Sequence, residues 1–140
     1  MKAPPIFPDH PVVRNDLLDY FVEIEHFDQM VARAIKTLEK AGQLDNTIVV
    51  VTSDHGMPFP RAKASLYDAG THVPLAIRWP KGIKDPGRGV DFCVNLSSLA
   101  PTFLAAAGLK APEMMTAGSL MGVFANKGNP ERRKIGRAHV

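Results

Sequence analysis

The sequence predicts an α/β fold, because helical and strand patterns alternate along its 140 residues. From Asn15 to Ala41, apolar side chains recur at three- and four-residue spacing, which is typical of an amphipathic helix. The β-branched run Thr47–Thr52 has no polar alternation, as in a central strand that is covered on both faces. A second strand, Pro74–Trp79, and a short helix ending before Gly108 follow. We therefore predict helix, strand, loop, strand and short helix in this order, with an incomplete sheet.

The long helix is expected at about residues 16–41. Asn15 or Asp16 is expected to cap its start, since short polar side chains accept hydrogen bonds from the first backbone N–H groups of a helix. Gly42 is expected to end it, because glycine readily adopts the left-handed conformation found after helices. Residues 1–14 contain four prolines, which favour extended backbone. We predict an extended lead-in for that segment.

Several side chains outside the main pattern receive structural interpretations. Ser97 or Ser98 is expected to cap the short helix, with Pro101 tolerated in its first turn. Cys93, the single cysteine, lies among apolar, strand-like residues and is predicted to be a buried, inert thiol. Trp79 ends the second strand and is expected in the core.

Composition narrows the classes of function. Hydrophobic residues make up 45% of the chain and charged residues 22%, as in a soluble globular domain. The net charge is +3, but four of the 17 basic residues lie in the last nine positions, which leaves 13 bases against 14 acids. A broad polyanion-binding surface is therefore not expected. No apolar run approaches the roughly 20 residues needed to cross a bilayer, so we predict partners other than nucleic acid or membrane.

Two adjacent metal-ligand side chains, Asp54 and His55, follow the first strand. Ligands of open α/β sheets gather beyond the carboxyl ends of strands, and a carboxylate and an imidazole there can bind one cation. Nine residues on, Lys63 adds a positive charge. Pro58 and Pro60 stiffen the loop between them and so restrict where Lys63 points. The pattern predicts a metal site that stabilises an oxyanion with charges already in place.

Structural interpretations of the same residues remain open. An isolated Asp-His pair often forms a strand-end turn in which Asp54 caps the next segment. A single Lys63 is often a solvated surface charge. Arg61 lies close enough to help to bind an anionic substrate, although it also fits a surface position. His72 is a further substrate-binding candidate at the pocket rim, or else a loop histidine.

Several motifs of this chain occur in the same order in a known family. Together they resemble the second signature region of the sulfatases, in the alkaline-phosphatase superfamily, with the run from Gly56 to Pro60 most similar to the heparan N-sulfatase-like branch. The motifs are Thr-Ser-Asp-His-Gly at residues 52–56, Lys-Ala-Ser-Leu-Tyr-Asp-Ala-Gly at 63–70, Val-Pro-Leu at 73–75, and the helix segments 20–28 and 96–108. The likeness covers most of residues 5–122.

This resemblance implies a partial alkaline-phosphatase-like sandwich and a metal-dependent hydrolase, similar to sulfoglucosamine sulfohydrolases, that cleaves sulfate esters or N-sulfates of sulfated carbohydrates. It implies a calcium ion and a formylglycine nucleophile made from a cysteine or serine. By position, Asp54 and His55 carry over as metal ligands and Lys63 as the catalytic contact to the sulfate. The family also implies a periplasmic, secreted or lysosome-like location.

One departure from the family concerns the metal. The family more often has asparagine at the position of His55, and imidazole suits zinc better than calcium. Zinc-dependent phosphatases of the same superfamily have an Asp-His pair. A zinc-dependent phosphoesterase or phosphonate hydrolase is therefore the alternative function.

The other departure concerns the nucleophile. The family motif, Cys or Ser followed by X-Pro-X-Arg, does not occur in the sequence, and the residues after Cys93 do not fit it. We therefore expect residues 1–133 to be the C-terminal portion of a sulfatase catalytic domain, inactive alone, with the nucleophile upstream. A non-catalytic fragment is the third interpretation. Residues 134–140 match the translation of a common sequencing-adapter read and are expected to be a non-native tail.

Overall fold

The computed structural model describes residues 2–91 and 93–125. The chain divides between Ile77 and Arg78 into two compact units, and each is described by itself. None of the helices described is both long and apolar enough to cross a membrane. The expected non-native tail at 134–140 lies outside the described residues. In chain order the elements are α1 (Pro11–Lys40), η1 (Leu44–Asn46), β1 (Val49–Thr52), α2 (Asp68–Thr71), β2 (Leu75–Arg78), η2 (Leu96–Ser98), α3 (Leu99–Ala106) and α4 (Met121–Phe124).

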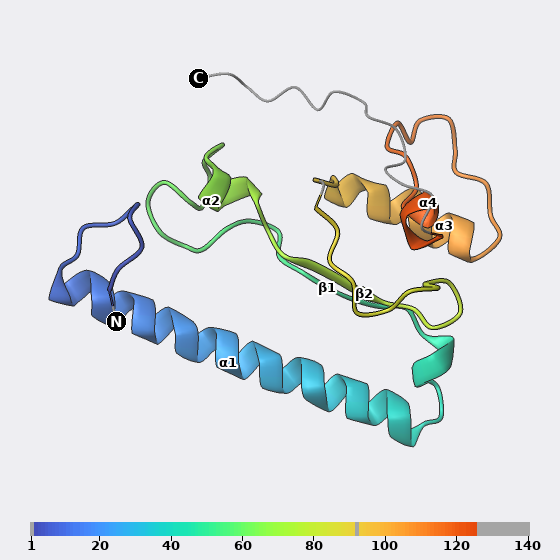
Figure 1. Ribbon diagram of the computed structural model, residues 1–140, viewed down its shortest axis with the longest axis horizontal. Helices are drawn as coiled ribbons and strands as arrows, with labels where there is room; N and C mark the ends of the chain where they lie inside the picture. Colours follow the sequence, from blue (N-terminus) through green and yellow to red (C-terminus); the bar gives the residue numbers. More distant parts are fainter. Residues whose placement is uncertain (1, 92, 126–140) are drawn as a thin grey trace. The chain divides into compact units, whose positions relative to one another are not determined.

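Helix α1 is a single long rod, and it begins earlier than predicted (Figure 1). Its N-cap is His10, whose Nδ1 accepts a hydrogen bond from Val12 N–H at 3.3 Å. Pro11 occupies the first helical position, where its fixed φ suits the helix and its missing N–H has no cost. The expectation that Asn15 or Asp16 caps the helix was therefore wrong. The end of the extended lead-in is helical as well.

The far end of α1 matches the expectation. The helix ends at Lys40, and Gly42 follows with a φ of 63°, the left-handed conformation. Without a Cβ, glycine adopts this conformation at no steric cost, which is why it ends the helix here. The predicted boundary is confirmed to within one residue.

The apolar face of α1 is only partly covered. Leu17 is fully buried, while Phe21 and Ile24, on the predicted apolar stripe, are 39% and 43% exposed. Val31 and Ile35, further along the same stripe, are half-buried. The stripe predicts correctly which residues share a face of the helix, but not how much of that face is covered.

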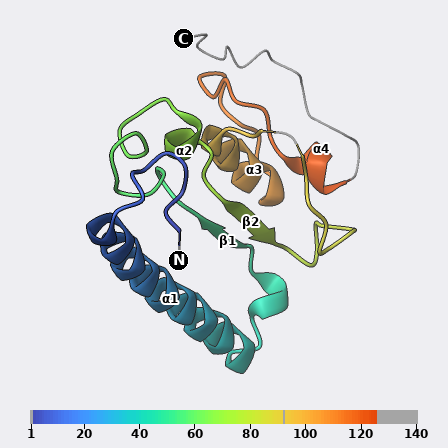
Figure 2. The same ribbon diagram turned by 60° about the vertical axis from the view of Figure 1, so that its left-hand side comes forward.

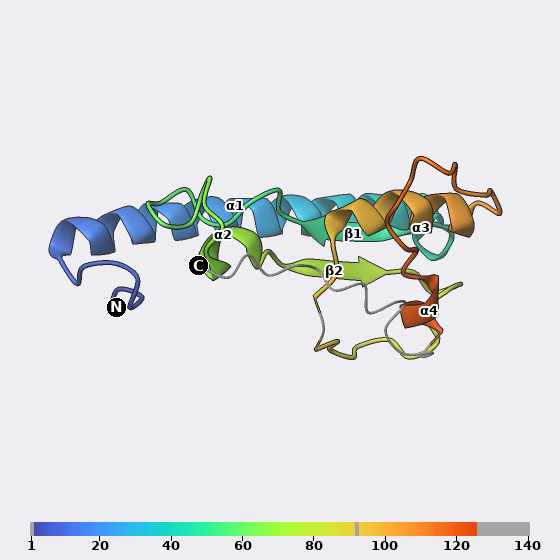
Figure 3. The ribbon, with the colours of Figure 1, turned by 90° about the horizontal axis from the view of Figure 1, so that it is seen from above.

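Strands β1 and β2 pair as an antiparallel, two-stranded sheet (Figure 3). At the end of β1, the Thr52 hydroxyl donates a hydrogen bond to Pro74 O at 2.8 Å, which ties the two strands together where the candidate site begins. All four residues of β1 are half-buried. In the described part of the chain the sheet therefore lacks the two-sided cover that was predicted, and β1 is not a central strand.

The second unit has a small core around a buried hydroxyl. Thr102 on α3 is 1% exposed. Its hydroxyl donates to Ser98 O at 2.6 Å and accepts from Leu120 N–H at 2.8 Å. Both hydrogen-bonding functions of the threonine are thus satisfied within the core, as burial of a polar group requires. Trp79 meets the buried Phe124 edge to face at 6.0 Å, and is half-buried rather than fully buried.

The start of α3 differs in one detail from the expectation. Asn95, rather than a serine, supplies the side-chain cap, because its Oδ1 accepts from Ser97 N–H at 2.9 Å at the start of the 3-10 turn η2. Ser98 makes no side-chain capping bond. Pro101 lies in the first turn of α3, and Gly108 follows the helix with a φ of 74°, both as predicted.

Cys93 is exposed, which contradicts the prediction of a buried thiol. The described residues beside it, 93–95, belong to neither a helix nor a strand. Apolar neighbours in the sequence indicated a strand, but burial of the thiol depends on a partner strand, and the sheet in the described part of the chain consists of β1 and β2.

Candidate functional site

Asp54 and His55 lie side by side in the turn that follows β1. Asp54 Oδ2 and His55 Nε2 are 3.6 Å apart, and the side chains are 86% and 35% exposed, respectively. The carboxylate is therefore open to solvent and the imidazole is partly packed. The structure brings the two predicted side chains together, with Asp54 Oδ2 facing His55 Nε2. That they bind a metal stays a prediction.

The Nδ1 atom of His55 indicates which tautomer the neutral imidazole adopts. His55 Nδ1 is 2.7 Å from the carbonyl oxygen of Gly56. Because a carbonyl oxygen only accepts hydrogen bonds, Nδ1 must carry the proton. In the neutral imidazole, Nε2 then presents its lone pair on the side of Asp54, which is the arrangement that metal-binding histidines adopt.

Backbone contacts hold the turn in shape. The Ser53 hydroxyl donates to His55 O at 2.6 Å, and Gly56 N–H donates to Gly70 O at 3.1 Å. A Cβ on Gly56 would lie 1.7 Å from the carbonyl oxygen of Ala69. Only glycine permits this approach of two backbone segments. Gly56 therefore holds the turn that contains the Asp-His pair against residues 69–70.

Lys63 lies at the end of a closed loop that starts just after the Asp-His pair. Its N–H donates to Met57 O at 3.1 Å, which joins the two ends of the loop. The neighbouring Ala62 is fully buried, while Lys63 is exposed. Arg61 and Ala64 on either side have φ values of 65° and 56°, a left-handed conformation that is uncommon for residues other than glycine. The loop path around Lys63 is therefore sharply constrained.

The Lys63 ammonium forms no ion pair within residues 2–91 and 93–125. Its charge is thus available to an external anion. That it converges with Asp54 and His55 on one ligand stays a prediction.

His72 is placed by a local contact. It follows α2, its N–H donates to Asp68 O at 2.8 Å, and its Nδ1 is 3.5 Å from Asp68 Oδ2, with both side chains strongly exposed. A role of His72 in substrate binding stays a prediction. Tyr67, the residue before α2, is 61% exposed.

The Asp-His pair can supply two ligands of a metal ion but not a whole site. Two atoms bonded to one cation at roughly 2.0–2.5 Å can lie about 3–4 Å apart, and the 3.6 Å between Asp54 Oδ2 and His55 Nε2 falls in this range. Within the part of the chain that the structure describes, no group of three or more His, Cys, Asp and Glu side chains is placed to hold a metal. A metal bound to this pair would need further ligands from outside the described residues.

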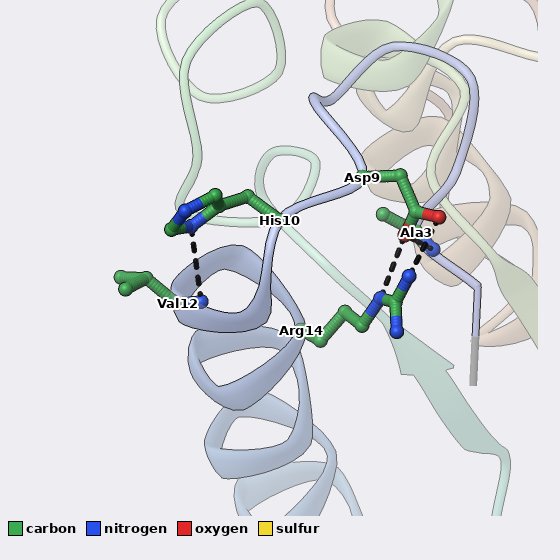
Figure 4. A network of polar contacts seen from close by, with 5 residues as sticks. All are labelled: Ala3, Asp9, His10, Val12 and Arg14. Carbon is green, nitrogen blue, oxygen red and sulfur yellow. Dashed lines mark hydrogen bonds and ion pairs between the residues drawn. The ribbon is translucent and has the colours of Figure 1, made fainter.

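The residues before α1 fold into a turn, the N-terminal turn, which lies near the loop that ends at Lys63 (Figure 2). This turn was not predicted from the sequence. Figure 4 shows its anchor: Arg14 Nε and Nη2 donate to the two carboxylate oxygens of Asp9, each at 2.7 Å, and Ala3 N–H donates to Asp9 Oδ1. The hydrogen bonds from Arg14, with that from Ala3, lower the pKa of Asp9 from 3.8 to about 2. The only sequence feature that pointed to this turn was the spacing between Asp9 and Arg14 in and beside the proline-rich segment.

The anchored turn carries an aromatic side chain to the loop. The rings of Phe7 and Phe59 are 5.4 Å apart, and Tyr20 on α1 meets Phe59 edge to face at 5.7 Å. Such tilted pairs are favourable arrangements of aromatic rings. The loop that ends at Lys63 is therefore packed against both the N-terminal turn and α1.

The sulfatase family model matches residues 7–109. An ulvan-active sulfatase of Formosa agariphila is 32% identical over 126 residues, which are 90% of this chain and 21% of the relative. Human N-sulphoglucosamine sulphohydrolase is 36% identical over 102 residues, 73% of this chain and 20% of the relative. An N-acetylglucosamine-6-O-sulfatase of Bacteroides thetaiotaomicron is 37% identical over 114 residues, which are 79% of this chain and 20% of the relative. The chain thus spans about a fifth of the length of these relatives.

A solved structure agrees with the sequence matches. It is described as a complex with its substrate, D-glucosamine-2-N,6-O-disulfate, and it aligns with a TM-score of 0.61 at 36% identity. The alignment covers 73% of this chain and 21% of that chain. The described elements therefore match part of an α/β fold of the alkaline-phosphatase type. From the family match and these likenesses, the chain belongs to the sulfatases, a family of sulfuric ester hydrolases.

Proposed function

We propose that Asp54, His55 and Lys63 form part of the active site of a metal-dependent sulfatase that removes sulfate from sulfated sugars. The observation that supports this most directly is the 3.6 Å pairing of Asp54 Oδ2 with His55 Nε2 at the end of β1. Family membership supports the reaction, and the names of two relatives, which act on sulfated glucosamines, support the substrate class.

In this proposal a divalent cation is held by Asp54 Oδ2 and His55 Nε2 together with ligands from outside the described residues. When bound, the cation supplies Lewis-acid stabilisation of negative charge on the sulfate oxygens. The Nδ1–H bond to Gly56 O keeps the imidazole in the ligating tautomer. Family resemblance favours calcium, whereas the imidazole ligand favours zinc. A zinc-dependent phosphoesterase therefore remains the alternative function.

Lys63 acts on the sulfate itself. The negative charge of a sulfate group is spread over several oxygens, and an ammonium fixed in position beside them stabilises the charge that develops in the transition state without reorganisation. The hydrogen bond from Lys63 N–H to Met57 O, with the left-handed residues on either side, limits the orientations of the loop. Arg61 and His72 are proposed to contact the rest of the substrate.

The nucleophile, a formylglycine, is proposed to come from sequence outside these 140 residues, because its motif does not occur among them. The isolated chain should therefore bind ligand without turnover. Grafting residues 7–109 into the matching segment of the Bacteroides relative tests this division. We expect hydrolysis of an aryl sulfate by the graft and none by the isolated chain; turnover by the chain alone would refute the division.

Within the active graft, Lys63→Met tests the contact to the sulfate. Loss of one stabilising charge should lower kcat by roughly 10²–10³-fold, in line with the loss of single oxyanion donors. Lys40→Met, at the exposed end of α1, is the matched control and should leave kcat unchanged. Equal kcat values for the two variants would remove Lys63 from the site.

The metal is tested by calorimetric titration of the metal-free graft with calcium and, separately, with zinc. Asp54→Ala and His55→Ala should each weaken binding at least tenfold, because each removes one of the two ligands that this chain supplies. Asp28→Asn, an exposed carboxylate on α1, is the matched control and should bind as the wild type does. Affinities that do not change in the two site variants would end the proposal, and strong preference for zinc would favour the phosphoesterase.

A further inference from the structure

A concave feature lies within the first unit, at the loop that ends with Lys63. It is a cavity of about 550 Å³ between the N-terminal turn, the first turns of α1 and the loop before Lys63, lined among others by Phe7, Val13, Asp16, Phe59 and Arg61. Cavities of about 300–1,000 Å³ are typical of small-ligand sites. The volume is sufficient for a sugar residue with its substituents.

The walls of this cavity combine apolar and charged groups. The tilted pair of Phe7 and Phe59 supplies aromatic surface, and aromatic rings pack well on the apolar C–H faces of sugars. Asp16 can accept hydrogen bonds from sugar hydroxyls, while Arg61 can donate to a sulfate or carboxylate. An apolar protein segment would leave both charges unpaired, so the charge pattern favours a hydroxylated, anionic ligand over a hydrophobic one.

Arg61 reaches this wall from a strained backbone. Its φ of 65° lies in the left-handed region, which costs a residue with a Cβ energy unless its surroundings impose it. Strain of this kind clusters at ligand-binding sites. The neighbouring Ala62 is fully buried and donates its N–H to Phe59 O at 3.1 Å, so the packing of the loop imposes the conformation that presents Arg61.

The cavity is continuous with the candidate site along the chain. Phe59 and Arg61 belong to the same closed loop that ends with Lys63, joined to Met57 by a hydrogen bond. The opposite wall carries Phe7 and is anchored by the paired Arg14 and Asp9. A ligand in the cavity would therefore touch the loop that positions Lys63.

We propose that this cavity binds a second sugar residue, one that carries its own anionic group, next to the residue whose sulfate is removed. The proposal rests on the proposed sulfatase function and extends it: the substrate is a sulfated chain of at least two sugars rather than a single sulfated sugar. Arg61 pairs with the anionic group of the second residue, Asp16 with its hydroxyls, and the aromatic pair packs on its ring.

The test is binding to the uniformly ¹⁵N-labelled 140-residue chain, followed by amide NMR shifts and calorimetry. The first ligand is a glucosamine disaccharide with an N-sulfate on one residue and a 6-O-sulfate on the other; the second lacks the 6-O-sulfate. We expect shifts at Phe7, Phe59 and Arg61 with the doubly sulfated ligand, and roughly tenfold weaker binding without the second sulfate, as for loss of a charge-assisted contact.

Variants separate charge from backbone strain. Arg61→Asn removes the guanidinium but tolerates the left-handed conformation. It should lower the affinity for the doubly sulfated ligand by about tenfold and leave the affinity for the singly sulfated ligand unchanged. Arg61→Lys keeps the charge and should restore most of the affinity. Lys40→Gln, at the other end of α1, is the matched control and should have no effect. Helix content by circular dichroism checks that each variant folds.

The two proposals fail in different ways. The site where sulfate is removed is affected by metal removal, by Asp54→Ala and by Lys63→Met. None of these changes should remove the shifts at Phe7 and Phe59. If those shifts persist while metal binding fails the test above, the cavity proposal stands alone. If the disaccharide shifts no amide among the cavity residues, or if Arg61→Asn affects both ligands equally, the second-sugar site is refuted.

Discussion

Helix α1 and the irregular segment 53–70 belong to the same unit, but different interactions hold each of them in its conformation. Helix α1 has 30 residues and one fully buried side chain, Leu17. Segment 53–70 has little regular structure, but it includes buried Ala62 and a glycine contact that admits no Cβ. Regularity comes from the backbone ladder of a helix, whereas tight packing depends on which segments meet. The candidate site lies in the segment where packing, not regularity, fixes the chain.

The largest expected effect is the loss of the anchor of α1. Leu17→Ala removes a completely buried side chain and should lower the free energy of unfolding by about 2–5 kcal/mol. The next residue, Leu18, is 49% exposed, so Leu18→Ala is the matched control and should cost less than about 1 kcal/mol. Urea denaturation measures both. Similar losses would show that the partly covered face of α1 carries more stability than Leu17 alone.

The next effect concerns the segment that carries the site. Gly56→Ala places a Cβ 1.7 Å from a backbone oxygen that cannot rotate away, and should cost about 1–3 kcal/mol, because crowding of this kind forces backbone shifts. It should also weaken metal binding, since the Asp-His turn moves with Gly56. Gly118→Ala, where nothing lies within 4 Å, is the control in the same denaturation and titration experiments. No difference between the two would show that the close approach is not needed.

A smaller effect compares one hydroxyl in each region. Ser53→Ala removes a half-buried donor to His55 O and should cost about 0.5–1.5 kcal/mol. Thr37→Val removes an exposed donor to Arg33 O on α1 and should change stability by less than about 0.5 kcal/mol. Thermal unfolding of the two variants decides. A larger loss for Thr37→Val would reverse the comparison between the regions.

The smallest effect is a pH dependence at the start of α1. The pKa of Asp9 is lowered to about 2 by its hydrogen bonds from Arg14 and Ala3, so the folded state holds the carboxylate more strongly than the unfolded chain does. This stabilisation is fully present above the ordinary pKa of 3.8 and is lost as the pH falls from there through about 2. The Phe7 amide resonance should shift over this interval in the wild type. The shift should be absent in Asp9→Asn, and its persistence there would assign it to another group.

The sequence by itself determined the kinds of element and several of their ends. Gly42 ends α1 because a left-handed residue is needed there, and Gly108 ends α3 for the same reason. The β-branched run ending at Thr52 located the strand, and the Asp-His pair at 54–55, one residue further on, located the candidate site. These features are local, so the pattern of a few neighbouring residues is sufficient to predict them.

Only the tertiary structure decided burial, caps and the shape of the site. Cys93 is exposed and β1 is half-buried because cover depends on partner segments, which no local pattern specifies. The tautomer of His55 follows from the position of the Gly56 carbonyl oxygen, and the cavity beside Arg61 exists because the N-terminal turn folds onto the loop. Contacts between residues far apart in the chain depend on their arrangement in space, which residue spacing alone does not determine.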